Sequence, residues 1–154
     1  MLGAERSRTS IAVVLMLLAV ALLASLAAGC GGGDGEAEGG QTTIAGVVAS
    51  DHGAKDVAGQ EEVELELDDN YFEPTVLKGS PGERLTITLA NEGEAEHNFT
   101  IETEKVDIDV EPGEEKTVSV TFPKSGTIAF YCEYHKSLDM AGGLEASSSD
   151  GSDY

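Results

Sequence analysis

Apolar and polar residues alternate with a period of two through the middle of the chain. Such alternation is typical of β-strands that bury one face and expose the other. The alternating segments are residues 63–67, 85–89, 99–102, 106–110 and 118–122. Turn-forming sequences separate them, such as GSPG at 79–82 and NEG at 91–93. With no long helical pattern, the sequence predicts an all-β fold, a β-sandwich of about seven to eight short strands.

The N-terminal segment predicts export from the cell. Arg6 and Arg8 precede an uncharged apolar stretch at residues 11–28, which ends in small residues. A basic start, an apolar stretch and a small-residue end are the parts of a secretory signal peptide. The stretch of 18 residues is also at the lower limit for a helix that spans a membrane, so an uncleaved anchor is the alternative.

The sequence LAAGC at residues 26–30 resembles the bacterial lipobox. In that motif the cysteine, here Cys30, is acylated and becomes the first residue of the mature chain. The sequence departs from the motif at Ala27, where leucine is more frequent. A run of glycines follows Cys30 at once, as a flexible tether would. We therefore expect lipidation of Cys30; the alternative is an ordinary signal peptide followed by an unrelated cysteine.

These features divide the chain into four parts. Residues 1–29 are the expected lipoprotein signal peptide. Residues 30–60 are interpreted as a flexible acidic and glycine-rich tether, in which the β-branched residues at 42–49 form a candidate strand. The alternating segments place the folded domain at residues 61–146, and residues 147–154 form a polar tail that we expect to be disordered. The sequence leaves open whether residues 42–60 join the sandwich.

Four side chains of the expected domain can bind a metal ion. Cys132, His135 and Met140 lie in one short loop, and His97 stands where an alternating strand begins. A thiolate, two imidazoles and a thioether are the ligands of a blue-copper electron-transfer site. Each residue also has a simpler interpretation, as a buried thiol, a surface histidine or a core methionine. With only two cysteines in the chain, lipidation of Cys30 leaves Cys132 without a disulfide partner, which favours a metal site.

Residues from about 72 to 146 resemble the cupredoxin family, of the plastocyanin and pseudoazurin kind. The resemblance lies in FEP at 72–74, the turn at 79–82, HN at 97–98, the segment 126–132 and the spacing Cys-x2-His-x4-Met. It implies an eight-stranded Greek-key sandwich that holds one type 1 copper ion near one end. It also implies that His97, Cys132 and His135 are strong equatorial ligands and that Met140 is the weak axial ligand.

Two residues of the ligand loop depart from the family pattern. In the family, the counterpart of Asn98 hydrogen-bonds near the cysteine loop and ties the two ligand segments together. Its usual partner is a serine or threonine after the cysteine, where this chain has Glu133, and a proline often stands at Tyr134. The expected tie therefore uses backbone groups or is absent, which affects loop rigidity and reduction potential.

The charge of the chain limits its partners. It has 29 acidic and 9 basic residues and a formal net charge of −20, which disfavours nucleic acid. Strong acidity can steer a basic redox partner, although acidic tethers also simply keep a protein soluble. Glu92, Glu94 and Glu96 precede His97. We hypothesise that their negative charge stabilises the oxidised copper site and lowers its reduction potential.

The predicted function is that of a surface-tethered one-electron carrier that cycles between Cu(II) and Cu(I). The alternatives are a copper storage or delivery lipoprotein, and a cupredoxin-like binding module of an envelope uptake system with weak or no copper. We expect no enzyme activity, because the one remaining histidine, His52, is interpreted as a solvated loop residue and copper enzymes need further histidine clusters. The expected protein is a monomer, held by lipid on the outer face of the cell membrane or in the periplasm, which meets a redox partner protein.

Overall fold

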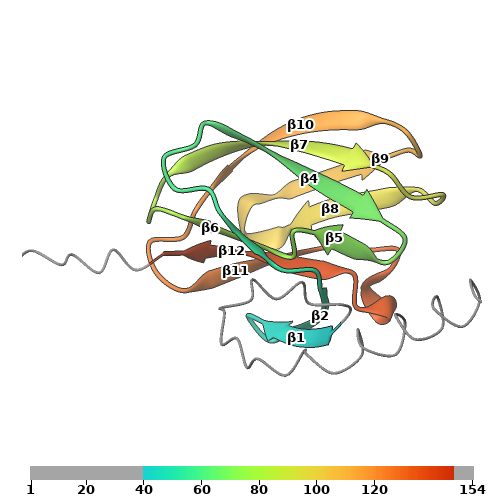
Figure 1. Ribbon diagram of the computed structural model, residues 1–154, viewed down its shortest axis with the longest axis horizontal. Helices are drawn as coiled ribbons and strands as arrows, with labels where there is room; N and C mark the ends of the chain where they lie inside the picture. The colour runs from blue at the N-terminus through green and yellow to red at the C-terminus, as the bar shows by residue number, and fades with distance from the viewer. Residues whose placement is uncertain (1–39, 148–154) are drawn as a thin grey trace, which may run out of the picture. The chain divides into compact units, whose positions relative to one another are not determined.

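The computed structural model describes residues 40–147, which form two packed β-sheets and a separate hairpin (Figure 1). The larger sheet has the order β3 (Ala54–Asp56), β6 (Val76–Gly79), β12 (Ala141–Ala146), β11 (Thr127–Tyr131), β8 (His97–Ile101) and β9 (Val106–Val110). The smaller sheet has the order β10 (Glu115–Thr121), β7 (Arg84–Asn91), β4 (Glu62–Asp68) and β5 (Tyr71–Glu73). The hairpin consists of β1 (Gly40–Ile44) and β2 (Val47–Asp51), and two short 3-10 helices are η1 (Glu102–Glu104) and η2 (Lys136–Leu138). The fold is the predicted β-sandwich.

The chain changes sheets repeatedly between β3 and β12, so each sheet combines strands that are distant in sequence. β4 pairs in parallel with β7, and β12 pairs in parallel with β6. Within the described residues the two sheets hold ten strands, more than the seven to eight expected. The additional strands are short: β3, β5 and β6 have three or four residues, too few for a period of two to be visible. In the part of the chain that is described, no helix has the length and apolarity to cross a membrane.

The alternation in the sequence marks the buried faces correctly for most strands. In β4, Val63, Leu65 and Leu67 are buried between exposed glutamates. β8 differs, because all five of its residues are buried, including the polar residues His97, Asn98 and Thr100. Hydrogen bonds compensate this burial in part: Thr100 Oγ1 donates to Asn98 Oδ1 over 2.5 Å. β8 therefore places three polar side chains in the interior of the sandwich.

Three phenylalanines fill the core between the sheets. Phe72, Phe99 and Phe130 contact one another, with ring centroids 5.0–6.1 Å apart in edge-on and tilted arrangements. Such aromatic contacts contribute about 0.5–1.5 kcal/mol per pair beyond the area that they bury. Cys132 and Met140 belong to the same buried cluster. The core therefore continues into the loop that carries the predicted ligands.

The N-terminal hairpin packs against β11 and β12. Ile44 and Ala49 of the hairpin form a small buried cluster with Tyr131 and Ala141. Gly143 of β12 is required for this contact, because a Cβ atom there would collide with the Ile44 side chain. The sequence left open whether residues 42–60 join the sandwich. Residues 40–60 contain β1, β2 and β3, so strand structure begins about twenty residues before the expected boundary at 61. The predicted signal peptide, Cys30 and nearly all of the tail lie outside the described residues.

Candidate metal centre

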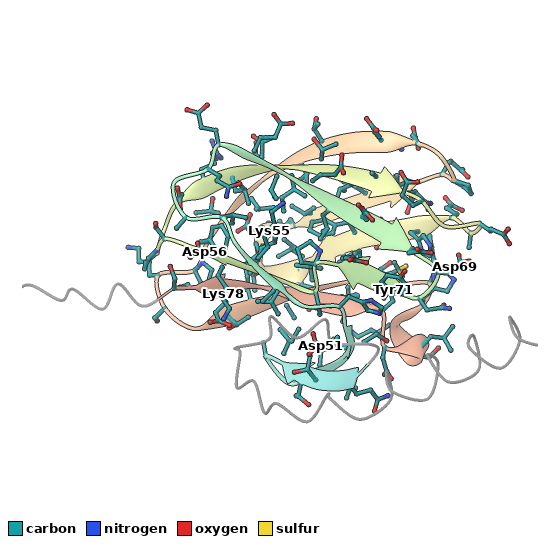
Figure 2. The ribbon with its side chains drawn as sticks, viewed as in Figure 1. Asp51, Lys55, Asp56, Asp69, Tyr71 and Lys78 are labelled. Carbon is teal, nitrogen blue, oxygen red and sulfur yellow. The ribbon has the colours of Figure 1, made fainter. Side chains whose placement is uncertain are left out.

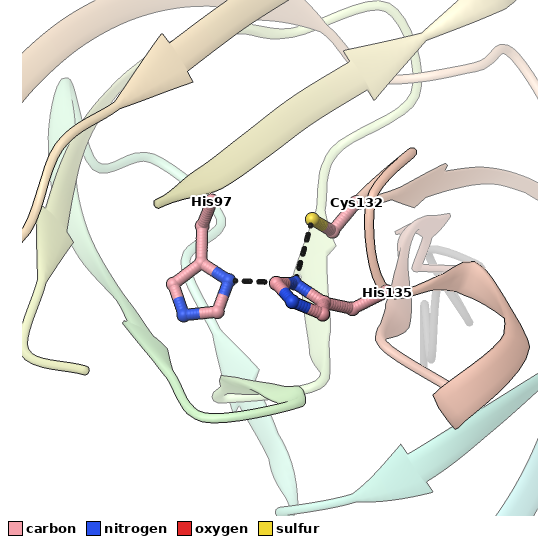
Figure 3. A group of neighbouring side chains, drawn as sticks. All are labelled: His97, Cys132 and His135. Carbon is pink, nitrogen blue, oxygen red and sulfur yellow. Dashed lines mark hydrogen bonds between the residues drawn. The ribbon is translucent and has the colours of Figure 1, made fainter. Parts of the chain in front are cut away.

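The first predicted ligand, His97, is the first residue of β8. It pairs with Val110 of β9 and is fully buried. The start of β8, the end of β11 and the turn after β4 lie at the same end of the sandwich (Figure 1). A histidine at this position is held by the sheet on one side and faces the ligand loop on the other (Figure 3).

The other three predicted ligands lie in the loop between β11 and β12, which closes on itself through backbone hydrogen bonds. The N–H of Cys132 donates to the carbonyl of Met140 over 3.0 Å, and the N–H of His135 donates to the carbonyl of Cys132 over 3.3 Å. Met140 N–H donates to the carbonyl of His135 over 3.3 Å. Asp139 adopts a left-handed conformation with φ of 64°, which turns the chain into Met140 and β12. The loop thus brings Cys132 and Met140 back to neighbouring positions.

The donor atoms of His97, Cys132 and His135 converge on one point. All three lie within 4.8 Å of one another. The two Nδ1 atoms are 3.2 Å apart, and Cys132 Sγ is 3.4 Å from His135 Nδ1 (Figure 3). Two imidazole nitrogens bound to one ion at about 2.0–2.1 Å, with an angle near tetrahedral, lie about 3.3 Å apart. The separations therefore match those of donors that share a single metal ion.

The donor chemistry fits copper. A free, fully buried thiol beside two imidazoles is the soft and borderline donor set that copper accepts in blue-copper sites. Met140 is fully buried in the cluster that contains Cys132, where a thioether is available as the weak fourth ligand. His135 is only partly buried, so one edge of the site faces the surface. The residues present are those of a mononuclear type 1 copper site.

The ring of His97 is prepared to bind as a neutral imidazole. Burial and the nearby His135 lower its pKa, while the carboxylates of Asp69 and Asp68 oppose that shift. Its Nε2 is buried without a hydrogen-bond partner, and Asp69 Oδ1 lies 3.9 Å away. Gly93 provides the space between them, since a Cβ atom there would come within 3.0 Å of both groups. Asp69 lies just before Tyr71 at the β4–β5 turn (Figure 2).

Asn98 occupies the position expected for the tie between the ligand segments. Its backbone N–H donates to Cys132 Sγ over 3.3 Å, which stabilises negative charge on the sulfur. Its side-chain Oδ1 accepts the backbone N–H of Glu133 at 3.5 Å, the long limit of a hydrogen bond. Its Nδ2 donates to Asp107 and Asp109 over 2.7 and 3.0 Å. A tie through the backbone of Glu133 therefore exists, but it is weak.

Several contacts around the site carry no signal in the sequence. Asp109 is an exposed position of an alternating strand, yet its carboxylate accepts hydrogen bonds from Asn98 and from Tyr134, and these lower its pKa. The same bond raises the pKa of Tyr134 to about 12, so the phenol stays a donor. The hydroxyl of Tyr131 donates to Glu102, and Lys136 lies 3.9 Å from the Tyr131 ring centroid. Only the topology brings these residues together.

His52, interpreted from the sequence as a solvated loop residue, is half-buried. Its ring stacks on that of Tyr71, with centroids 3.6 Å apart and planes 9° apart. Its backbone N–H donates to Thr75 Oγ1 over 2.7 Å. The solvated interpretation is wrong, because β5 supplies a flat aromatic surface to which the sequence around His52 gives no clue. His52 is not among the grouped donors of the metal centre.

The fold and the site together define a small β-sandwich protein with one mononuclear metal centre. A family model described as a Cupredoxin-like domain matches residues 40–144, more than half of the chain. The chain therefore belongs to the cupredoxin-like family. The matched region includes the hairpin and all four predicted ligands. No curated protein matches the chain.

Solved structures resemble the chain at low sequence identity. Auracyanin from Roseiflexus castenholzii is 20% identical over 57% of this chain and 98% of its own, with a TM-score of 0.49. Auracyanin A from Chloroflexus aurantiacus, described as a blue copper protein, is 21% identical over 56% of this chain and 99% of its own, with a TM-score of 0.45. The metal-binding domain of the Cu(I)-exporting P-type ATPase CopA of Streptococcus pneumoniae is 16% identical over 60% and 96%, with a TM-score of 0.48.

Proposed function

We propose that this protein is a blue-copper electron carrier that accepts and donates one electron at a time. The observation that carries the proposal is the convergence of His97 Nδ1, Cys132 Sγ and His135 Nδ1 within 4.8 Å at the end of a rigid sandwich. Copper bound there supplies the Cu(II)/Cu(I) couple. His97, Cys132 and His135 would hold the ion strongly, and Met140 would be its weak axial ligand.

The surroundings of the donors support electron transfer. The thiol and His97 are fully buried, so water has no access from their side, and a site that keeps its ligands in place changes little between the two oxidation states. The partly buried His135 shares its loop with Tyr134 and Leu138, which are 50% and 54% exposed. A partner that covers these two exposed side chains would come close to the predicted ligand loop. We propose a redox partner with a basic surface, because the chain is strongly acidic.

The visible and EPR spectra of the copper-loaded protein test this function. Addition of Cu(II) to the metal-free protein should give an intense thiolate-to-copper band in visible light. Cys132→Ser should abolish that band, since the thiolate is its source. Met140→Leu should keep the colour and raise the reduction potential, because loss of the thioether donor disfavours Cu(II). A wild-type protein that stays colourless with Cu(II) would contradict the proposal.

The two alternatives give different results in the same experiments. A copper storage or delivery protein would lose Cu(I) readily to a competing chelator. A binding module with weak or no copper would neither colour with Cu(II) nor gain thermal stability from it. An electron carrier should instead keep Cu(I) against the chelator and exchange electrons with a small redox mediator without loss of metal.

We further propose that lipid on Cys30 holds the protein at the outer face of the cell membrane. The support is the lipobox-like sequence LAAGC followed by the glycine-rich run at 31–33. Membrane fractions of cells that express the full chain should contain the protein, and Cys30→Ser should move it to the soluble fraction or retain an unprocessed precursor. Mass spectrometry of the N-terminal peptide should show a diacyl or triacyl group. An unmodified Cys30 peptide in the mature protein would contradict lipidation.

A further inference from the structure

The strongest unexplained feature beside the metal centre is a chain of side-chain hydrogen bonds on its outer surface. Asn98 Nδ2 donates to Asp109 Oδ1 over 3.0 Å, and the hydroxyl of Tyr134 donates to the same oxygen over 2.7 Å. We refer to Asn98, Asp109 and Tyr134 as the Asp109 bridge. It joins the consecutive strands β8 and β9 to the ligand loop, which lies more than twenty residues further along the chain.

We propose that the Asp109 bridge positions His135 and replaces the side-chain tie that residue 133 does not supply. This inference rests on the proposed copper function. Asp109 and Tyr134 are thus positioning residues, which act on the metal through His135 and touch no metal themselves.

The direct connection between Asn98 and the loop is too long to hold the loop alone. The Glu133 N–H lies 3.5 Å from Asn98 Oδ1, and that oxygen already accepts the Thr100 hydroxyl at 2.5 Å. The bond from Tyr134 to Asp109 is much shorter and ends on a carboxylate, and such charge-assisted bonds are about twice as strong as neutral ones. The better connection therefore runs through residue 134.

Asp109 is itself fixed from two further directions. It pairs with Asn98 in the antiparallel register of β8 and β9. Its backbone carbonyl accepts Lys116 Nζ from β10 of the other sheet over 2.7 Å. The loop is therefore attached to a residue that both sheets hold. Tyr134 directly precedes His135, so an anchored hydroxyl restricts the backbone from which the His135 ring projects.

The bridge is tested by hydrogen exchange in the metal-free protein and by EPR in the copper-loaded one. Tyr134→Phe removes only the hydroxyl. We expect amides 134–139 to exchange at least fivefold faster, and the copper hyperfine splitting and reduction potential to shift. Tyr71→Phe is the matched control, because its hydroxyl also donates to an aspartate, Asp68, over 2.7 Å but lies outside the loop. It should change exchange of the loop by less than twofold.

A second pair of variants tests whether the residues act as one unit. Asp109→Leu should loosen the loop at least as much as Tyr134→Phe, and the double variant should exchange no faster than Asp109→Leu alone. Additive effects, or loop exchange in Tyr134→Phe within twofold of wild type, would overturn the bridge. An unchanged EPR spectrum would overturn its positioning role even if exchange rises. If the wild type binds no copper, the proposed function fails, and the exchange measurements still decide the bridge.

Discussion

His97 and His135 have the same chemistry but are supported in opposite ways. His97 is part of a sheet strand, is 0% exposed and has a register partner in β9. His135 stands in a loop held by a few hydrogen bonds and is only partly buried. The comparison teaches that the sheet fixes one side of the centre, whereas the other side is reached from the surface and depends on local contacts.

The largest expected difference between the two sides is in stability. Phe99→Ala removes a buried ring of β8, two residues after His97, that contacts Phe72 and Phe130, and such changes typically cost about 3–5 kcal/mol. Leu138→Ala on the loop removes a side chain that is 54% exposed, and surface changes are usually within about 0.5 kcal/mol. Urea unfolding of the metal-free protein measures both. Equal costs would show that the loop is as integral to the fold as β8.

The second difference concerns access to the metal. His135→Gly should leave an opening at the surface through which added imidazole restores the visible band. His97→Gly should leave a sealed cavity, since the side chain is fully buried. We expect at least tenfold more imidazole to be needed for His97→Gly, a difference of about 1.4 kcal/mol. Titration of both variants with Cu(II) and imidazole measures the imidazole concentration that restores the visible band. Equal concentrations would contradict the difference in access between His97 and His135.

The third and smaller effect involves the hairpin, which contacts the loop side. Gln41 Nε2 donates to Asp139 Oδ2 over 2.6 Å, one residue before Met140. Gln41→Ala should cost about 0.5–1.5 kcal/mol of unfolding free energy and should speed copper loss to a chelator. Gln60→Ala is the control, because Gln60 also donates from an exposed side chain, to the Asp56 carbonyl over 3.2 Å. Copper loss at equal rates in both variants would show that the hairpin does not support the loop.

The smallest effect is electrostatic. Glu92, Glu94 and Glu96 are exposed just before His97. Negative charge favours Cu(II) over the less positive Cu(I), so changing the three residues to glutamine should raise the reduction potential. Solvent and salt screen exposed charges, and we expect a rise of no more than about 40 mV, roughly 1 kcal/mol for one electron. Voltammetry at low and high salt measures the shift, which should shrink as salt is added; a fall in potential would contradict the hypothesis.

The β-sandwich and the convergence of three ligands could be predicted because each has a local signal. Period-two alternation reports which face of a strand is buried, and the spacing of Cys132, His135 and Met140 places these residues in one turn. His97 could be predicted as a further ligand because it stands at the start of an alternating strand. Its proximity to His135 is confirmed by the 3.2 Å distance between their Nδ1 atoms.

The remaining contacts depend on pairings between distant segments. Asp109 meets Tyr134 only because β9 lies beside β8, and no property of residue 109 alone indicates a partner 25 residues away. Likewise, the β-branched residues at 42–49 indicate a candidate strand but do not indicate a hairpin or the sheet on which it packs. The hairpin packs on β11 and β12, and the periodicity of its own sequence does not indicate this contact.

The docked hairpin connects the ligand loop mechanically to the N-terminal side of the described chain. Ser50 N–H donates to the Asp139 carbonyl over 2.9 Å, and Gln41 Nε2 donates to the side-chain carboxylate of the same residue. β1 is the first of the described strands, so a load applied from its N-terminal side reaches it before any other of them. If lipid on Cys30 holds the protein, as we propose, tension from the membrane would act first on the contacts beside Met140, and anchoring would be coupled to the rigidity of the ligand loop.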